Sequence, residues 1–198
     1  MKFYWCGKSR ALRIGWMMEE LGLPYERIRV DIRDNDAKRD ADFLAASPLS
    51  KVPALVDGET KLWDSGAICL HLADSYPEAC LGVAPGDPRH GAFLQWIMFT
   101  NAVIEPAMVE KLAGLAVDPL RYGQSSFNQI IETLESGIGS GPWIMGERFT
   151  AADVLLGSST HFLETFGFLP EASPLKAYAE RCRARPAFQT AQSFDADS

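Results

Sequence analysis

The sequence predicts a mixed α/β segment followed by an all-helical segment. Over roughly the first 75 residues, short β-prone runs alternate with helical patterns in the order β-α-β-α-β-β-α. A stretch with three prolines and two glycines, 76–88, comes next, and beyond it no strand pattern of any length occurs. This order is typical of two layered units joined in sequence. We therefore expect domains at 1–77 and 89–198, with a linker at 78–88.

The α/β segment begins with an aromatic strand and a helix. Lys2–Trp5 is short and β-prone. Ser9 is placed to cap a helix that runs to Leu21, with Gly22 as its stop. Tyr25–Asp31 then alternates weakly, which predicts a second strand.

A short helix, a hairpin and a longer helix complete this segment. The short helix is expected near 43–46. Val52–Val56 and Lys61–Trp63 are predicted strands, and Asp57-Gly58 between them is a strong hairpin signal. Ser65–Ser75 then follows a helical pattern.

The second segment carries only helical periodicity. The expected helices are 90–115, 124–137, 151–166 and 174–183. Thr150-Ala151-Ala152-Asp153 is a capping box, in which a hydroxyl and a carboxylate satisfy the backbone N–H groups at a helix start. Such a cap stabilises a helix by about 1 kcal/mol, and its role is structural.

Composition excludes several kinds of function. The formal net charge of −7 predicts an acidic surface, so nucleic acid is not expected as a partner. The four cysteines lack metal-site spacing, and a chain of this size needs no disulfide framework, so we expect free thiols and no metal. The sequence shows no secretory leader and no apolar run near the ~20 residues of a membrane span. We therefore expect a soluble cytoplasmic protein without a membrane partner.

An unusual proline opens the predicted third strand. In Lys51-Val52-Pro53, the proline lacks the N–H group that a strand ladder needs. A cis Val52–Pro53 bond would leave the backbone of Val52 exposed, and exposed backbone can pair with an extended peptide ligand. An ordinary edge-strand proline is the alternative, and the local pattern alone favours it.

A second ligand-binding pattern lies where the fourth strand gives way to a helix. The free N–H groups and the positive dipole end of a helix start favour an anion, and the hydroxyl of Ser65 can add a donor. Asp64 beside it can meet an ammonium group. A plain Asp-Ser helix cap is the alternative.

These motifs, in this order, resemble the cytosolic glutathione transferases, and bacterial members in particular. The resemblance also rests on Trp16, on the run 19–26 (Glu-Glu-Leu-Gly-Leu-Pro-Tyr-Glu) and on the capping box at Thr150. It implies a thioredoxin-like N-terminal domain and an all-helical C-terminal domain. It also implies glutathione as co-substrate, whose thiolate is transferred to a small hydrophobic electrophile in detoxification.

The resemblance implies a role for each residue of the glutathione site. The strand with Val52 and cis Pro53 would hold the cysteinyl backbone of glutathione. Asp64 and Ser65 would hold its γ-glutamyl end, and Lys51 would reach its glycyl carboxylate. Asp64 departs from the family pattern, in which glutamate or glutamine is usual, so its shorter side chain makes direct contact harder to reach.

Ser9 and Cys6 are the two main candidates for the residue that acts on the sulfur of glutathione, and Arg10 is the third candidate. Ser9 would donate a hydrogen bond to the glutathione thiolate, and its alternative role is to cap the first helix. Cys6, in Cys6-x-x-Ser9, resembles the monothiol motif of glutaredoxins and would make the protein a thiol reductase. Its alternative role is that of a small buried residue. Arg10 would supply positive charge.

The resemblance further implies an electrophile pocket between the domains and a homodimer. A non-catalytic glutathione-binding module is a separate alternative, because a fold does not fix a function. Aromatic and methionine side chains at helical spacing are more often core residues than pocket linings. The candidate pocket residues are Trp96, Phe99, Met108 and Phe166.

Overall fold

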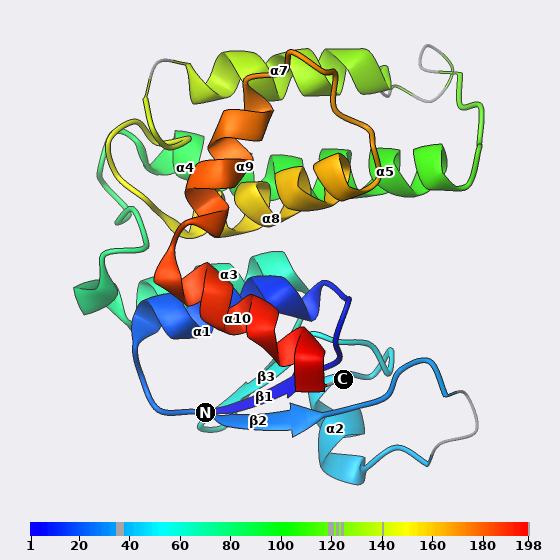
Figure 1. Ribbon diagram of the computed structural model, residues 1–198. Coiled ribbons are helices and arrows are strands. Elements are labelled where there is room, and N and C mark those ends of the chain that lie inside the picture. The colour runs from blue at the N-terminus through cyan, green and yellow to red at the C-terminus, as the bar shows by residue number, and fades with distance from the viewer. Residues whose placement is uncertain (35–37, 119–120, 122, 124, 140, 198) are drawn as a thin grey trace. The chain divides into compact units, whose positions relative to one another are not determined.

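The structure is a computed structural model that describes residues 1–34, 38–118, 121, 123, 125–139 and 141–197. The chain divides into two compact units, Met1–Gly82 with Arg183–Ser198, and Val83–Cys182 (Figure 1). The predicted order of mixed α/β followed by all-helical structure is confirmed. The predicted domain limits 1–77, 78–88 and 89–198 stay a prediction. In addition, the segment from Arg183 onward groups with the first unit.

The first unit is built on a four-stranded sheet of order β2-β1-β3-β4. Its strands are β1 (Lys2–Trp5), β2 (Glu26–Arg29), β3 (Ala54–Asp57) and β4 (Thr60–Trp63). Strand β1 is parallel to β2 and antiparallel to β3, and β3 is antiparallel to β4. The hairpin predicted at Asp57-Gly58 is confirmed by the pairing of Asp57 with Thr60. Gly58 has φ +59, a left-handed conformation that glycine adopts without steric cost.

Helices cover both faces of this sheet (Figure 1). They are α1 (Ala11–Leu21), α2 (Ala41–Ala46), α3 (Ser65–Ser75), η1 (Pro77–Ala79), α10 (Pro186–Ser193) and η3 (Phe194–Asp197). Helices α1, α3 and α10 lie on one side of the sheet and α2 lies on the other. Trp16 of α1 and Phe188 of α10 are both fully buried and meet edge to face, with ring centroids 5.0 Å apart. This aromatic contact anchors the C-terminal helix, which the sequence patterns did not predict.

The second unit is all helical, as predicted. Its helices are α4 (His90–Phe99), η2 (Thr100–Ile104), α5 (Glu105–Leu112), α7 (Phe127–Ile138), α8 (Ala151–Thr165) and α9 (Leu175–Arg183). The helix expected over 90–115 is present as α4, the π-helical turn η2 and α5, and ends at Leu112. The expected helix start at Gln124 lies outside the described residues, and α7 begins at Phe127.

One long apolar helix in the second unit bears on the expectation that the protein has no membrane partner. The continuous helix His90–Leu112 is 23 residues long and, by length and composition alone, apolar enough to cross a membrane. The sequence reasoning missed it because polar residues interrupt the apolar run. A single helix of this kind is weak evidence for a membrane span, since core helices reach the same length and composition.

The start of α8 forms a buried polar cluster inside the second unit. Asp153 is fully buried, and its carboxylate accepts hydrogen bonds from the backbone N–H of Ile144 (2.8 Å) and of Thr150 (2.9 Å). The hydroxyls of Thr150 (3.1 Å) and Tyr178 (3.0 Å) donate to it as well. Burial raises the pKa of Asp153 to about 6, although these four donors oppose the shift. The capping box predicted at Thr150 is therefore confirmed as a structural element.

Candidate functional site

The proline strand of the first unit has the predicted cis bond between Val52 and Pro53. Strand β3 begins at Ala54, so the buried residue Val52 precedes the paired ladder. The buried residue Ser47 fixes the chain just before it, because its hydroxyl accepts from the N–H of Lys51 (3.1 Å) and donates to the Lys51 carbonyl (2.7 Å). The side chain of Lys51 is exposed. The segment expected to hold a peptide backbone is thus positioned by hydrogen bonds from within the unit.

At the start of helix α3, the N-cap residue Asp64 is exposed and conformationally unusual, and Ser65 after it is buried. Asp64 is its N-cap, and its Oδ1 accepts from the N–H groups of Gly66 (2.9 Å) and Ala67 (3.4 Å). The cap expected as an alternative reading of Asp64 is therefore present. Asp64 also has φ +74 and ψ 125, a conformation that costs a non-glycine residue on the order of 1–3 kcal/mol. Strained residues of this kind cluster at ligand-binding sites.

A buried arginine, which the sequence reasoning missed, lies behind this helix start. Arg13 of α1 is 1% exposed, and its Nη1 donates to the hydroxyl oxygen of Ser65 at 3.2 Å. The Ser65 hydroxyl accepts in this contact, so it retains its own proton to donate. Arg13 adds a positive charge at a helix N-terminus that already favours an anion. An arginine among the apolar residues of α1 was the signal that could have identified it.

The turn between β1 and α1 holds the candidates for sulfur chemistry. The hydroxyl of Ser9 donates to the Cys6 carbonyl at 2.6 Å and accepts from the N–H of Ala11 at 3.1 Å. A hydroxyl has only one proton to donate, and in Ser9 that proton is in the hydrogen bond to the Cys6 carbonyl. Ser9 must give up that bond before it can donate to a ligand. Arg10 is the N-cap residue of α1.

Two side chains from distant parts of the sequence contact this turn, and the sequence patterns predicted neither. Nη1 of Arg33 lies 3.1 Å from Cys6 Sγ, and its Nη2 donates to the carbonyls of Gly7 (2.8 Å) and Lys8 (3.1 Å). The N–H of Lys8 donates to Asp195 Oδ1 at 2.9 Å, and Lys8 has φ +52. The position of the Cys6 sulfur is therefore set by the strand that precedes it and by Arg33.

Tyr4 of strand β1 is buried against helix α2. It is 2% exposed and packs against Phe43 with ring centroids 5.3 Å apart. Burial raises the pKa of Tyr4, and the nearby carboxylates Asp42, Asp40 and Glu26 raise it further. The phenol therefore stays protonated.

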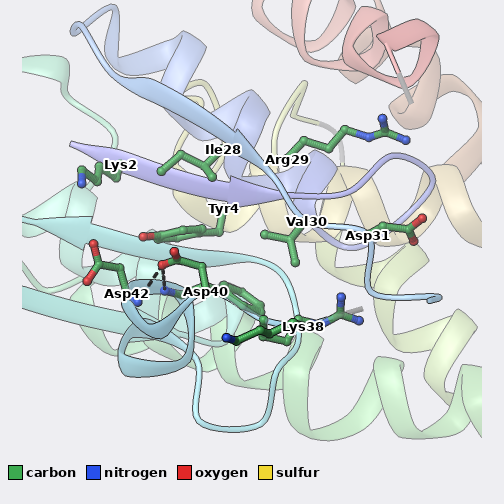
Figure 2. Close-up of a pocket in the computed structure, with 11 residues that line it drawn as sticks. Lys2, Tyr4, Ile28, Arg29, Val30, Asp31, Lys38, Asp40 and Asp42 are labelled. Atoms are coloured by element: carbon green, nitrogen blue, oxygen red, sulfur yellow. Dashed lines mark hydrogen bonds between the residues drawn. The ribbon is translucent and has the colours of Figure 1, made fainter. Parts of the chain in front are cut away.

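The first unit also contains a cavity of about 450 Å³ beside strands β1 and β2 and helix α2 (Figure 2). Lys2, Tyr4 and Ile28 line one side, and Lys38 and Asp40 lie across from them. None of the predicted site residues is among its lining residues.

The four residues predicted to line an electrophile pocket all lie in the second unit and fall into separate groups. Trp96 and Phe99 meet edge to face with centroids 5.6 Å apart. The Trp96 ring packs on Gly137, where an added Cβ would lie 2.3 Å from it. Met108 is fully buried, and Phe166 is 39% exposed beside Phe162. Burial favours a core role for Met108, and the pocket itself stays a prediction.

Comparison with known proteins agrees with this arrangement. The family model described as glutathione S-transferase, N-terminal domain, matches residues 1–74. Glutathione S-transferase F14 of Arabidopsis thaliana is 26% identical over 94% of this chain and 78% of its own length. The solved structure of a sphingomonad glutathione S-transferase, complexed with glutathione, covers 100% of both chains with a TM-score of 0.83 and 25% identity. The chain is thus similar to glutathione transferases in its sequence and in its fold.

These similarities confirm the predicted fold, a thioredoxin-like N-terminal domain followed by a helical domain. The proteins that resemble this chain do not all have the same named activity. The disulfide-bond oxidoreductase YfcG of Escherichia coli K12 is 27% identical over 93% of this chain and 90% of its own length. These similarities leave conjugation and disulfide chemistry as two alternatives, and the residues around sulfur must distinguish them.

Proposed function

We propose that this protein binds glutathione on its first unit and conjugates it to a small hydrophobic electrophile. The observation that carries the proposal is a pair of elements in that unit, the cis Val52–Pro53 segment before β3 and the start of α3 at Asp64 and Ser65. An extended tripeptide with a carboxylate at each end matches such a frame, because it needs backbone pairing in its middle and anion sites at its ends.

The γ-glutamyl end is assigned to the α3 start. Its α-carboxylate would accept from the Ser65 hydroxyl and from the helix N-terminus, with the buried Arg13 charge behind them. Its ammonium group would meet the exposed side chain of Asp64.

The middle and the glycyl end are assigned to the proline strand. The backbone of Val52, which precedes the β3 ladder, would pair with the cysteinyl residue of glutathione. The exposed ammonium group of Lys51 would reach the glycyl carboxylate. A surface ion pair of this kind contributes about 0–1 kcal/mol, so Lys51 tunes affinity rather than defining the site.

A glutathione-dependent thiol reductase that uses Cys6 is the second candidate function. Two observations favour it: Arg33 contacts the Cys6 sulfur, and the Ser9 proton is already donated to a carbonyl. The similarity to an oxidoreductase also supports it. Ser9, Arg10 and Cys6 remain the three proposed groups for activating the glutathione thiol in conjugation.

We also assign the protein to the cytoplasm as a homodimer that acts in detoxification. Free cysteines, including the exposed Cys80, suit a reducing compartment. Exposed large apolar side chains favour self-association, and light scattering would measure it. Those in the described residues include Leu49, Trp63, Met98, Val109 and Leu112.

Retention on immobilised glutathione followed by turnover of chlorodinitrobenzene tests the proposal. Retention with turnover is the expected result. Retention without turnover on this and several other electrophiles favours the reductase or a non-catalytic binding module. Incubation with glutathione disulfide separates these two, because only the reductase gains a glutathione adduct on Cys6. Failure to bind immobilised glutathione contradicts the proposed site itself.

A further inference from the structure

The cavity beside β1, β2 and α2 has a buried polar group in its lining that the described chain leaves unsatisfied. Tyr4 is 2% exposed and lines this cavity, whose volume is about 450 Å³. The Tyr4 hydroxyl makes no hydrogen bond to any residue that the structure describes. Buried polar groups in folded proteins nearly always have a partner. A hydroxyl that lacks one, in the lining of a cavity of ligand size, therefore points to a bound partner.

Two carboxylates lie near the phenol oxygen. Figure 2 shows Asp40, the N-cap of α2, and Asp42 on the same side of the cavity as this oxygen. Burial raises the pKa of Tyr4, and the negative charges of Asp42 and Asp40 raise it further. Asp40 uses Oδ1 to accept the N–H groups of Asp42 (2.8 Å) and Phe43 (3.4 Å), whereas the exposed Asp42 carboxylate accepts from no described residue. A primary ammonium group matches this end, because it can donate to both the Asp42 carboxylate and the Tyr4 oxygen.

The remainder of the cavity combines an apolar surface with basic side chains. The buried Phe43 ring packs on Tyr4 with centroids 5.3 Å apart, and the partly buried Ile28 and Val30 also line the cavity. Lys38 lies across from Tyr4 and forms no ion pair within the part of the chain that the structure describes. The other basic lining residues are Lys2, Arg29 and Arg39. A ligand that carried only a positive charge would be repelled by these side chains, so the ligand needs a negative group as well.

We propose that this cavity binds an α-amino acid with an apolar side chain. Its ammonium group would lie between Asp42 and the Tyr4 oxygen, and its side chain would contact the Phe43 ring. Its carboxylate would face Lys38, whose flexible stem lets the charge follow the ligand. None of the residues assigned to glutathione lines this cavity, so the inference does not rest on the proposed function.

Calorimetric titration of the full-length protein with three related probes tests the inference. L-phenylalanine carries both charged groups, 2-phenylethylamine lacks the carboxylate, and 3-phenylpropionate lacks the ammonium group. L-phenylalanine should bind about ten-fold more tightly than either of the other two, because each of them leaves one charged group of the cavity without its partner. No binding of L-phenylalanine by the wild-type protein would leave solvent as the partner of the Tyr4 hydroxyl and overturn the inference. Tighter binding of either truncated probe would overturn it as well.

Four variants assign the contacts. Asp42→Asn should weaken L-phenylalanine binding about ten-fold, and Lys38→Gln, at an exposed site, by up to about five-fold. Tyr4→Phe should weaken it about five-fold without lowering the midpoint of urea denaturation, because the hydroxyl has no partner to lose among the described residues. Asp74→Asn, an exposed aspartate of α3, is the matched control for Asp42 and should change nothing. Equal affinity in Asp42→Asn and wild-type protein overturns the inference.

A final titration separates this cavity from the proposed glutathione site. Saturating reduced glutathione should leave the affinity for L-phenylalanine unchanged, because the two sites use different residues. Displacement of L-phenylalanine by glutathione would overturn the inference, since both would then occupy one site. Protein that binds L-phenylalanine but not glutathione would support the inference and contradict the proposed function. The two failures are therefore distinguishable.

Discussion

Two helix starts in this molecule use the same residue types for opposite purposes. Helix α3 begins at Asp64-Ser65 in the first unit, and α8 begins at Thr150 and Asp153 in the second. Asp64 is exposed, has a strained backbone and uses one oxygen for capping. Asp153 is fully buried, and four donors surround its carboxylate.

This difference in burial and in hydrogen bonding distinguishes a structural cap from a cap that can also bind a ligand. A buried carboxylate whose acceptors are satisfied by the chain has no capacity left for a ligand. An exposed cap with a strained backbone and an adjacent hydroxyl can serve both the helix and a ligand. Substitutions at the two starts should therefore separate stability from glutathione binding.

Removal of the buried carboxylate should have the largest effect. Asp153→Ala leaves the Tyr178 hydroxyl and the N–H groups of Ile144 and Thr150 without their acceptor inside the second unit. We expect the free energy of unfolding to fall by about 3–5 kcal/mol. Urea denaturation measures it. A loss below about 1 kcal/mol would contradict the structural role of this cluster.

The same residue should give the protein a distinct pH dependence. The pKa of Asp153 is raised from 3.8 to about 6, so the native state holds its proton more tightly than the unfolded state does. The resulting stabilisation is complete below pH 3.8 and is lost as the pH rises through about 6. Over this window it amounts to about 3 kcal/mol. Wild-type stability minus that of Asp153→Asn should therefore fall between pH 4 and pH 7, and a flat difference would contradict the raised pKa.

At the exposed start of α3, binding should be lost with little loss of stability. Asp64→Gly removes a cap worth about 1 kcal/mol but relieves a positive φ that glycine adopts freely, so stability should change by less than about 0.5 kcal/mol. Glutathione affinity should still fall about ten-fold, because the ammonium group loses its partner. Asp64→Ala, which keeps the strain, should lose about 1 kcal/mol of stability as well. Calorimetric titration measures the affinity for glutathione, and urea denaturation measures the stability. Unchanged affinity in both variants would contradict a role for Asp64 in binding glutathione.

A third helix start provides the smallest effect and a control. Ser126 caps α7 in a box with Gln129, whose N–H donates to the Ser126 hydroxyl at 3.3 Å. Ser126→Ala should cost about 0.5–1 kcal/mol of stability and leave glutathione affinity unchanged. Altered affinity in this variant would show that helix caps influence binding indirectly, which would weaken the comparison.

Local sequence patterns predicted the hairpin at Asp57-Gly58 and the start of α8, because both depend on residues within a few positions of each other. The cis bond at Pro53 was left between two alternatives, since the local pattern favours an ordinary proline. The contacts of Arg33 with Cys6 and of Asp195 with Lys8 had no local signal, because they join residues far apart in sequence.

The packing of α10 on the first unit could not be predicted for the same reason. Its anchor, Phe188, meets Trp16 of α1, and no periodicity within either helix reveals that partner. Arg13 carried a signal of its own, a charged residue among apolar helix positions, but a buried charge has a meaning only when its partner Ser65 is known. Sequence patterns therefore identified the binding frame better than the residues that support it.

Calorimetric titration with reduced glutathione tests the central claim most directly. Wild-type protein and Ser126→Ala should bind with the same affinity, and Ser65→Ala should bind about ten-fold more weakly because the γ-glutamyl carboxylate loses its hydroxyl donor. Urea denaturation of Ser65→Ala establishes that the variant is folded. No detectable binding by wild-type protein, or equal affinity in wild-type protein and Ser65→Ala, would contradict a glutathione site at the start of α3.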